Sequence, residues 1–124
     1  MSDKVKSEMT PDVLVAVDDL FFAARIESVA KATGANILRV AEPGQFWATL
    51  DNRIPRLIII DLNSRAFNSV DVITKIKGNP NLAGTRVVGF YSHVQVELGR
   101  AAEIAGCEVL RRSVFVAKLP ALLK

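Results

Sequence analysis

Four polar residues stand at the ends of apolar segments, where their side chains could take part in chemistry. Asp18 and Asp19 directly follow the run VLVAV, Asp61 ends the run LIIID, and Ser92 ends the run RVVGFYS. An aspartate can act as a nucleophile in phosphoryl transfer and form an aspartyl phosphate. A cluster of carboxylates favours a hard cation, and Mg²⁺ typically takes one or two carboxylates together with waters and phosphate oxygens. These residue types indicate metal-assisted phosphoryl chemistry if the fold brings them together.

Five short apolar segments rich in β-branched residues predict five strands. Continuous apolar runs of this length are typical of strands that are covered on both faces. The predicted strands are Val13–Val17, Asn36–Val40, Leu57–Asp61, Arg86–Ser92 and Cys107–Leu110.

The segments between and after these strands have apolar residues at helical spacing and predict five helices. We expect Ser69 and Ser113 to cap the helices that they begin. Pro120 is expected to kink or split the last helix, because proline lacks the amide proton that a helix interior needs. The predicted helices are Leu20–Thr33, Gln45–Leu50, Ser69–Lys77, Val94–Ala105 and Val114–Leu123.

Strands that alternate with helices predict an α/β fold, a doubly wound five-stranded parallel sheet with helices on both faces. We expect the flavodoxin-like strand order 2-1-3-4-5, in which strands one and three are neighbours. Function in such sheets lies at the carboxyl ends of the strands. Asp18, Asp19 and Asp61 would then meet at one edge with Ser92, and their crowding would raise at least one carboxylate pKa unless a cation joins them.

The composition is typical of one globular domain. The chain has 124 residues, of which 50% are hydrophobic, and a formal net charge of +3. We expect residues 1–11 to form a flexible N-terminal tail and residues 12–124 to form the domain. The apolar runs are too short to span a membrane, and the single cysteine, Cys107, fits a cytoplasmic protein. The basic residues near the C-terminus are not dense enough to indicate a nucleic-acid surface.

The motifs together resemble the receiver domain of bacterial two-component response regulators. The matching segments are VDD (Val17–Asp19), IIIDLN (Ile58–Asn63), FYS (Phe90–Ser92) and the pair Ala105-Gly106. The resemblance covers Asp12 to Leu123, and it depends on the order and spacing of these short motifs.

The resemblance implies a function for each matching residue. Asp61 would be the phosphoacceptor, and Asp18 and Asp19 would hold Mg²⁺ with Asp61 and the backbone carbonyl of Asn63. Ser92 would be the switch hydroxyl. The protein would be a stand-alone receiver that takes a phosphoryl group from a histidine kinase or phosphotransfer protein, with at most self-phosphorylation and self-dephosphorylation activity. A downstream protein would bind the face formed by the fourth helix, the fifth strand and the fifth helix.

The sequence also departs from the receiver pattern. Receivers usually have a Lys-Pro pair after strand five, and this chain has Arg111-Arg112-Ser113. Arg112 is the nearest counterpart of that lysine, although its planar guanidinium is a different donor. The usual aromatic residue of strand five is replaced by Val109 or Leu110. These departures favour the alternative of a pseudo-receiver, a protein-binding module that works without phosphorylation.

Simpler interpretations stay open for most of these residues. Asp18 or Asp19 could cap the helix that follows them, and Ser92 could cap the next helix along the chain. Arg112 could pair with the acidic residues in the resting protein. Of Phe21 and Phe22, we expect one in the core and one on the surface. A dinucleotide site or a P-loop is not indicated, because neither glycine motif is present.

Overall fold

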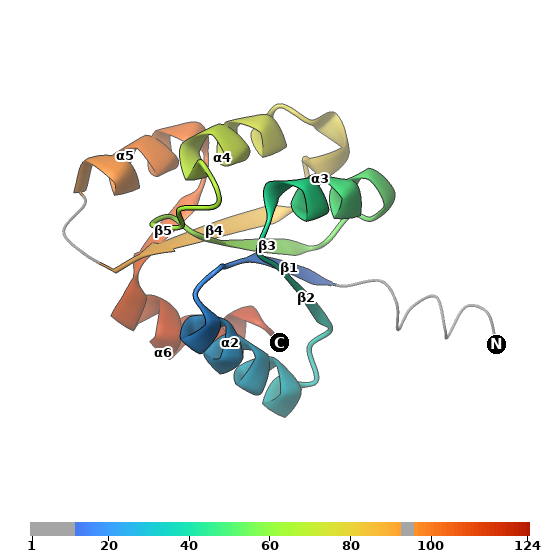
Figure 1. The fold of residues 1–124 in the computed structure, drawn as a ribbon, viewed down its shortest axis with the longest axis vertical. Coiled ribbons are helices and arrows are strands. Elements are labelled where there is room, and N and C mark those ends of the chain that lie inside the picture. The colour runs from blue at the N-terminus through green and yellow to red at the C-terminus, as the bar shows by residue number, and fades with distance from the viewer. Residues whose placement is uncertain (1–11, 93–95) are drawn as a thin grey trace.

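A parallel five-stranded sheet forms the centre of the computed structural model, which describes residues 12–92 and 96–124 (Figure 1). The strand order is β2-β1-β3-β4-β5, and all four neighbouring pairs are parallel, as predicted. The predicted flexible tail at residues 1–11 lies outside the described residues. The strands are β1 (Val13–Ala16), β2 (Ile37–Val40), β3 (Leu57–Asp61), β4 (Arg86–Tyr91) and β5 (Glu108–Arg111).

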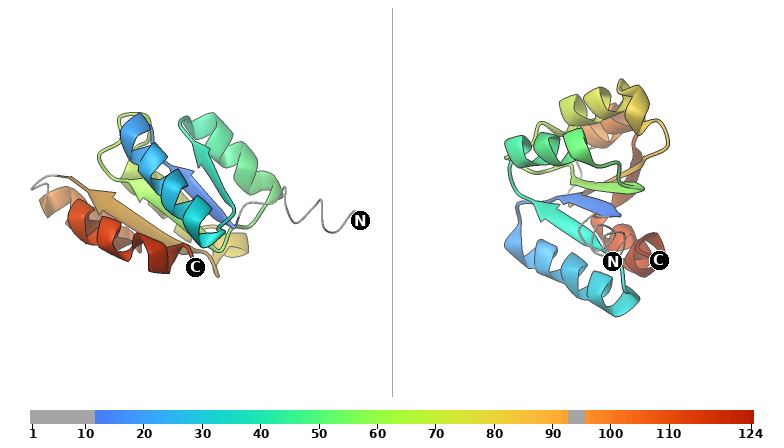
Figure 2. Two further views of the ribbon diagram at one scale, coloured as in Figure 1. Left: turned by 90° about the horizontal axis from the view of Figure 1, so that it is seen from below. Right: turned by 90° about the vertical axis from the view of Figure 1, so that its right-hand side faces the viewer.

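Helices cover both faces of the sheet. Two of them, α2 and α6, lie on one face, and α3, α4 and α5 lie on the other (Figures 1 and 2). The helices are α2 (Leu20–Thr33), α3 (Pro43–Asn52), α4 (Ser69–Lys77), α5 (Val96–Ala105) and α6 (Arg112–Leu122), with a short 3₁₀ helix, η1 (Pro80–Leu82). None of the helices in the described part of the chain is long and apolar enough to cross a bilayer.

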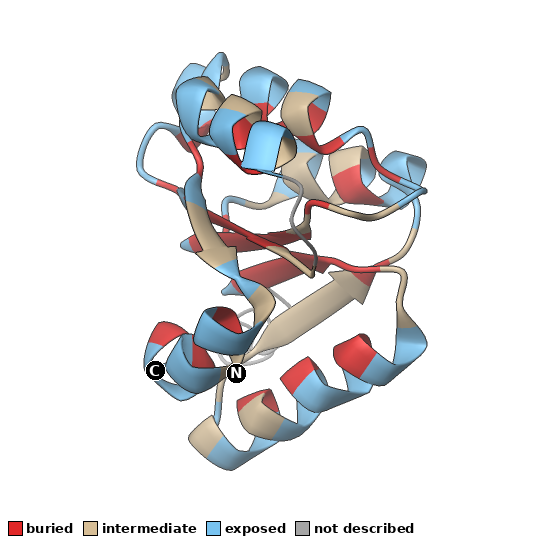
Figure 3. Cartoon of the chain, turned by 90° about the vertical axis from the view of Figure 1, so that its left-hand side faces the viewer, coloured by how far each residue is buried: buried red, intermediate tan, exposed pale blue. Residues whose placement is uncertain are grey.

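The apolar run of β1 supplies both halves of the core, because side chains alternate between the two faces of a strand. Val13 and Val15 pack toward α2 and α6, where Phe115 is fully buried. Leu14 packs on the opposite face, where α3 contributes the fully buried Phe46. Figure 3 shows the result: the central strands are buried, and exposed residues lie on the outward sides of the helices. A continuous apolar strand is therefore required here, as the sequence indicated.

The predicted start of α2 is confirmed in detail. Asp19 is the N-cap residue, and its side chain accepts a hydrogen bond from the backbone N–H of Phe22 at 3.1 Å. Of the two phenylalanines, Phe22 is 3% exposed and belongs to the core, whereas Phe21 is 92% exposed. Asp19 therefore fixes the direction in which α2 leaves the sheet.

Two predicted helix caps are wrong. The N-cap of α4 is Asn68, and Ser69 instead lies in the first turn, where its buried hydroxyl donates to the backbone oxygen of Leu62 at 3.2 Å. Ser113 also lies inside a helix, because β5 runs directly into α6 and Arg111 occupies the N-cap position.

Other boundaries differ less. Pro120 does not split α6, which continues as one helix to Leu122, because proline removes only the hydrogen bond of its own missing N–H. The predicted beginning of α5 at Val94 lies outside the described residues. Cys107 is buried, as expected, and burial raises the pKa of its thiol to about 12. The strand β5 begins one residue later than predicted, at Glu108.

Candidate functional site

The carboxyl ends of β1, β3 and β4 meet at one cavity of about 330 Å³. Asp61 is the last residue of β3, and Ser92 directly follows β4. The acidic pair lies in the turn between β1 and α2. The parallel sheet thus brings together Asp18, Asp19, Asp61 and Ser92, as their positions at the strand ends predicted. The cavity is lined by Asp18, Asp19, Asp61, Asn63, Arg65, Phe90, Ser92 and Arg112.

Asp61 is held in an environment that disfavours its charge. Burial is the main reason that the pKa of this carboxyl is raised, and the nearby charges of Asp18 and Asp19 raise it further. Two contacts oppose this effect. The backbone N–H of Asn63 donates to Asp61 Oδ1 at 2.9 Å, and the positive charge of Arg112 lowers the pKa. The effect of burial on the pKa is larger than the effect of these two contacts, so the ionised carboxylate is destabilised. A cation bound beside it would offset that destabilisation.

Arg112 lies between the acidic pair and the aromatic core. Its Nη2 atom lies 3.7 Å from Asp19 Oδ2, and its guanidinium carbon lies 4.2 Å from the ring centroid of Phe22. That ring in turn lies 4.6 Å from the ring of Phe90 and 5.8 Å from the ring of Phe115. A guanidinium at this distance from an aromatic face is attracted by the ring as well as by the carboxylate. The expected pairing of Arg112 with the acidic cluster is therefore present.

Asn63 has a role that sequence reasoning missed. Its side-chain oxygen accepts a hydrogen bond from the backbone N–H of Ser92 at 2.9 Å, and the Ser92 hydroxyl lies 3.5 Å from the same oxygen. The resemblance had indicated only the backbone carbonyl of Asn63. No sequence signal pairs these residues, because their contact depends on two loops that meet after β3 and β4.

The oxygen-rich lining fits a hard cation in chemical type. Within residues 12–92 and 96–124, however, no group of three or more histidine, cysteine, aspartate or glutamate side chains is arranged to hold a metal ion. Asp19 is engaged with the start of α2 and with Arg112. Asp18 and Asp61 remain as carboxylates beside Asn63, which matches the one or two carboxylates that Mg²⁺ typically takes. The predicted metal ligands stay a prediction.

Comparison with solved structures decides the fold family. A response regulator from Chloroflexus aurantiacus superposes with a TM-score of 0.80 at 16% identity, covering 93% of this chain and 95% of that one. The chain has a receiver-domain fold. The chemotaxis response regulator CheY4 of Vibrio cholerae gives a TM-score of 0.78 at 14% identity, with 93% and 97% covered. The phosphorylated cyanobacterial phytochrome response regulator RcpA gives 0.75 at 16% identity, with 93% and 89% covered.

The sequence comparisons give no family for the chain. No family model and no curated protein sequence matches the chain. Identities of 14–16% to these solved structures show a likeness of fold alone, so the role of each site residue must be argued from this chain's own geometry.

Proposed function

We propose that the protein is a stand-alone receiver that accepts a phosphoryl group on Asp61. The observation that supports this proposal is the position of Asp61: it ends a buried central strand, faces an open cavity, and lies among Asp18, Ser92 and Arg112. A capping carboxylate would not need a second acidic residue beside it. An excess of like charge near a buried strand is costly unless a cation or phosphoryl chemistry makes use of it.

The reaction would begin with a carboxylate oxygen of Asp61 attacking the phosphorus of the donor. A phosphorus–oxygen bond forms, the bond to the leaving group breaks, and the product is an acyl phosphate. The backbone N–H of Asn63 holds Asp61 Oδ1 at 2.9 Å, so Oδ2 would be the attacking atom. Mg²⁺, when bound by Asp18, Asp61 and the Asn63 carbonyl, would neutralise the negative charge of the incoming group.

Ser92 and Arg112 would then bind the phosphoryl oxygens. The Ser92 hydroxyl would leave Asn63 Oδ1, to which its present distance is 3.5 Å, and donate to the phosphoryl group. Arg112 would exchange its 3.7 Å contact with Asp19 for a charge-assisted hydrogen bond to the same group. This exchange would also release Asp19 toward the metal, so one movement would complete both parts of the site.

The donor and the downstream partner follow from the same proposal. A histidine kinase or phosphotransfer protein would supply the phosphoryl group, as it does for receivers in general. The face formed by α5, β5 and α6 would change its affinity for a partner, because Ser92 and Arg112 lie where β4 and β5 lead into these helices. The protein would work in the cytoplasm.

The test is intact-mass measurement after incubation with acetyl phosphate and Mg²⁺, beside an Asp61→Asn variant. We expect the wild type alone to gain the mass of one phosphoryl group, and we expect chelation of the metal to prevent it. If the folded wild type gains no mass with the metal in excess, phosphoryl transfer to Asp61 is ruled out under these conditions.

One observation favours the pseudo-receiver as a second candidate. Asp19 and Arg112 are engaged with each other and with α2, in an arrangement that holds the site together without a metal. This second function predicts that wild type and Asp61→Asn bind the partner with equal affinity. It also predicts that acetyl phosphate does not change that affinity.

A further inference from the structure

A second and larger cavity opens at the β5 edge of the sheet, next to the acidic one. It measures about 820 Å³, which is within the range of small-molecule sites. Its lining comes from five elements: Arg25 of α2, Tyr91 of β4, Val96 of α5, Arg111 of β5, and the first turns of α6. Because five elements contribute to it, the cavity depends on the fold and not on one helix, and it is open to solvent.

The charged residues described in the lining of this cavity are all arginines. Arg25, Arg111 and Arg112 contribute three guanidinium groups, and no carboxylate is among the described residues that line it. Arg25 and Arg111 are exposed, and within residues 12–92 and 96–124 neither makes an ion pair. Guanidinium groups bind phosphate and carboxylate oxygens through two parallel hydrogen bonds. The cavity is therefore complementary to an anion.

The remaining lining residues are largely apolar. The ring of Tyr91 and the side chains of Val96 and Val116 lie in the same cavity as the arginines. Val96 is 57% exposed, which leaves an apolar surface that a ligand could cover. A bare inorganic anion would use the arginines and leave this surface in water. A ligand with a flat or apolar part would use both.

From these observations we propose that the cavity binds an organic phosphate of nucleotide size. The phosphates would lie on Arg25 and Arg111, and the apolar or planar part would pack against Tyr91, Val96 and Val116. We favour this ligand over an acidic peptide, which would use the arginines and leave the apolar part of the lining uncovered. The proposal goes beyond phosphoryl acceptance, since the ligand would bind without reacting and without using Asp61.

Two arginines allow the two cavities to be tested separately. Arg112 and Ser92 line both, whereas Arg25 and Arg111 line only the larger one. Their exposure also makes Arg25→Ala and Arg111→Ala safe for folding, which circular dichroism would verify. Lys31→Ala is the matched control, because it removes one exposed positive charge from α2 outside both cavities.

The experiment is isothermal titration calorimetry of the full chain with ATP, in a chelating buffer that keeps the acidic cavity free of metal. We expect ATP to bind more tightly than adenosine or inorganic tripolyphosphate. Because each arginine would donate charge-assisted hydrogen bonds, Arg25→Ala and Arg111→Ala should each weaken binding by at least about tenfold. Lys31→Ala should change it by less than about twofold.

Four results would overturn the proposal. They are no heat of binding with ATP, equal binding of tripolyphosphate and ATP, tighter binding of a hexaglutamate peptide than of ATP, and ATP binding that survives both arginine substitutions. The Asp61→Asn variant should bind ATP as the wild type does. Failure of this inference is thus distinguishable from failure of phosphoryl transfer, which the mass measurement tests alone.

Discussion

The side chain of Asn63 connects the two loops that carry the proposed nucleophile and the proposed switch hydroxyl. Its Oδ1 atom accepts a hydrogen bond from the backbone N–H of Ser92 at 2.9 Å, while its own backbone N–H donates to Asp61 Oδ1 at 2.9 Å. One residue therefore holds Asp61 and Ser92 in a fixed relation. The Ser92 hydroxyl, which lies 3.5 Å from the same oxygen, could turn away while the backbone hydrogen bond stays in place.

Replacing Asn63 by alanine should weaken the fold by about 1 kcal/mol, the usual contribution of one hydrogen bond. The substitution removes the acceptor for the Ser92 N–H and keeps the backbone contact with Asp61. The free energy of unfolding, measured with urea, would check the effect. Asn81→Ala, at an exposed position on η1, is the control and should be close to neutral. If both variants unfold alike, the Asn63 side chain contributes nothing to stability.

Gly89 should not tolerate even a methyl group. A Cβ atom built there would lie 2.7 Å from Cδ2 of Leu62 and 3.0 Å from Sγ of Cys107, both of which are buried. Overpacking of this kind costs about 1–3 kcal/mol. We expect Gly89→Ala to lower the unfolding free energy by that amount in a urea titration. Gly84→Ala, where nothing lies within 4 Å, should have little effect, and equal losses for the two variants would contradict the packing argument.

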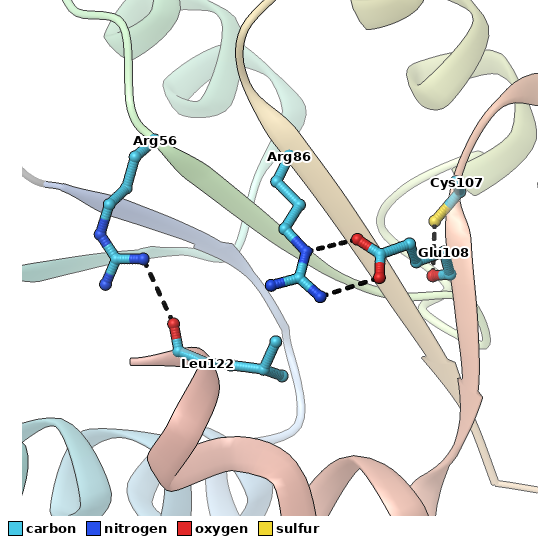
Figure 4. Close-up of polar contacts among 5 residues, drawn as sticks. All are labelled: Arg56, Arg86, Cys107, Glu108 and Leu122. Carbon is cyan, nitrogen blue, oxygen red and sulfur yellow. Dashed lines mark hydrogen bonds and ion pairs between the residues drawn. The ribbon is translucent and has the colours of Figure 1, made fainter. Parts of the chain in front are cut away.

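The ion pair between Arg86 and Glu108 connects β4 to β5 at the amino ends of these strands (Figure 4). The Arg86 side chain donates two hydrogen bonds to the carboxylate, and these lower the pKa of Glu108. Because both side chains are about half exposed, we expect Glu108→Gln to cost only about 0.5 kcal/mol.

The pH dependence of this pair has a definite sign. A carboxylate with a lowered pKa stabilises the fold above its unfolded pKa, and the stabilisation is lost as the pH falls through the folded value. The difference between wild type and Glu108→Gln should therefore be present at pH 7, begin to decrease near the ordinary glutamate pKa of 4.5, and disappear only below the lowered pKa of the folded state. Chemical unfolding at pH 7 and pH 3 would measure it. A difference that is as large at pH 3 as at pH 7 would mean that packing, not charge, is responsible.

The sequence predicted the strands more accurately than the helix ends, for a physical reason. Each inner strand is covered on both faces, so an unbroken apolar run such as Leu57–Asp61 is needed and stands out. At the start of α4, by contrast, Asn68 and Ser69 are both good capping residues. The choice depends on the backbone oxygen of Leu62, which takes the Ser69 hydroxyl and leaves the cap to Asn68.

The sequence predicted only those site residues that lie at the ends of the strands. Parallel strands bring Asp61 and the acidic pair to one edge whatever the other residues are. The contact of Arg112 with Phe22 depends instead on how α6 packs beside α2, which no local pattern encodes. The second cavity, with Arg25 on one helix and Arg111 on a strand far along the chain, could be found only in three dimensions.

Arg112→Ala should strongly slow the phosphorylation of Asp61 by acetyl phosphate. It should lower the stability of the fold only slightly. The loss of the Phe22 contact costs about 0.5–1 kcal/mol in stability. The loss of a cation that would bind the phosphoryl group should reduce the rate of mass gain at least about tenfold. Arg112→Lys keeps the charge and should retain most of the rate. A wild-type rate in Arg112→Ala would exclude this residue from the proposed reaction.

Asp61→Asn should stabilise the protein in the absence of metal. An acid whose pKa is raised by burial destabilises the fold when it ionises, so stability decreases as the pH rises from the unfolded value of 3.8 through the folded one. The asparagine removes this cost and keeps an oxygen for the Asn63 N–H. Its gain in unfolding free energy should be present at pH 7 and absent below pH 3.8, whereas the control Asp12→Asn, at an exposed position outside the helices, should change stability little at pH 7.

Added Mg²⁺ should make the wild type more stable than Asp61→Asn, the reverse of their order without metal. If Asp61 is a ligand, added Mg²⁺ binds only the folded wild type and raises its stability as the logarithm of the metal concentration. Asp61→Asn, which has lost the ligand charge, should respond much less. Thermal unfolding of both proteins across a Mg²⁺ titration, with Na⁺ at matched ionic strength as the control, would measure this difference. Parallel responses would show that the metal acts on the surface charge in general, and that Asp61 does not bind it.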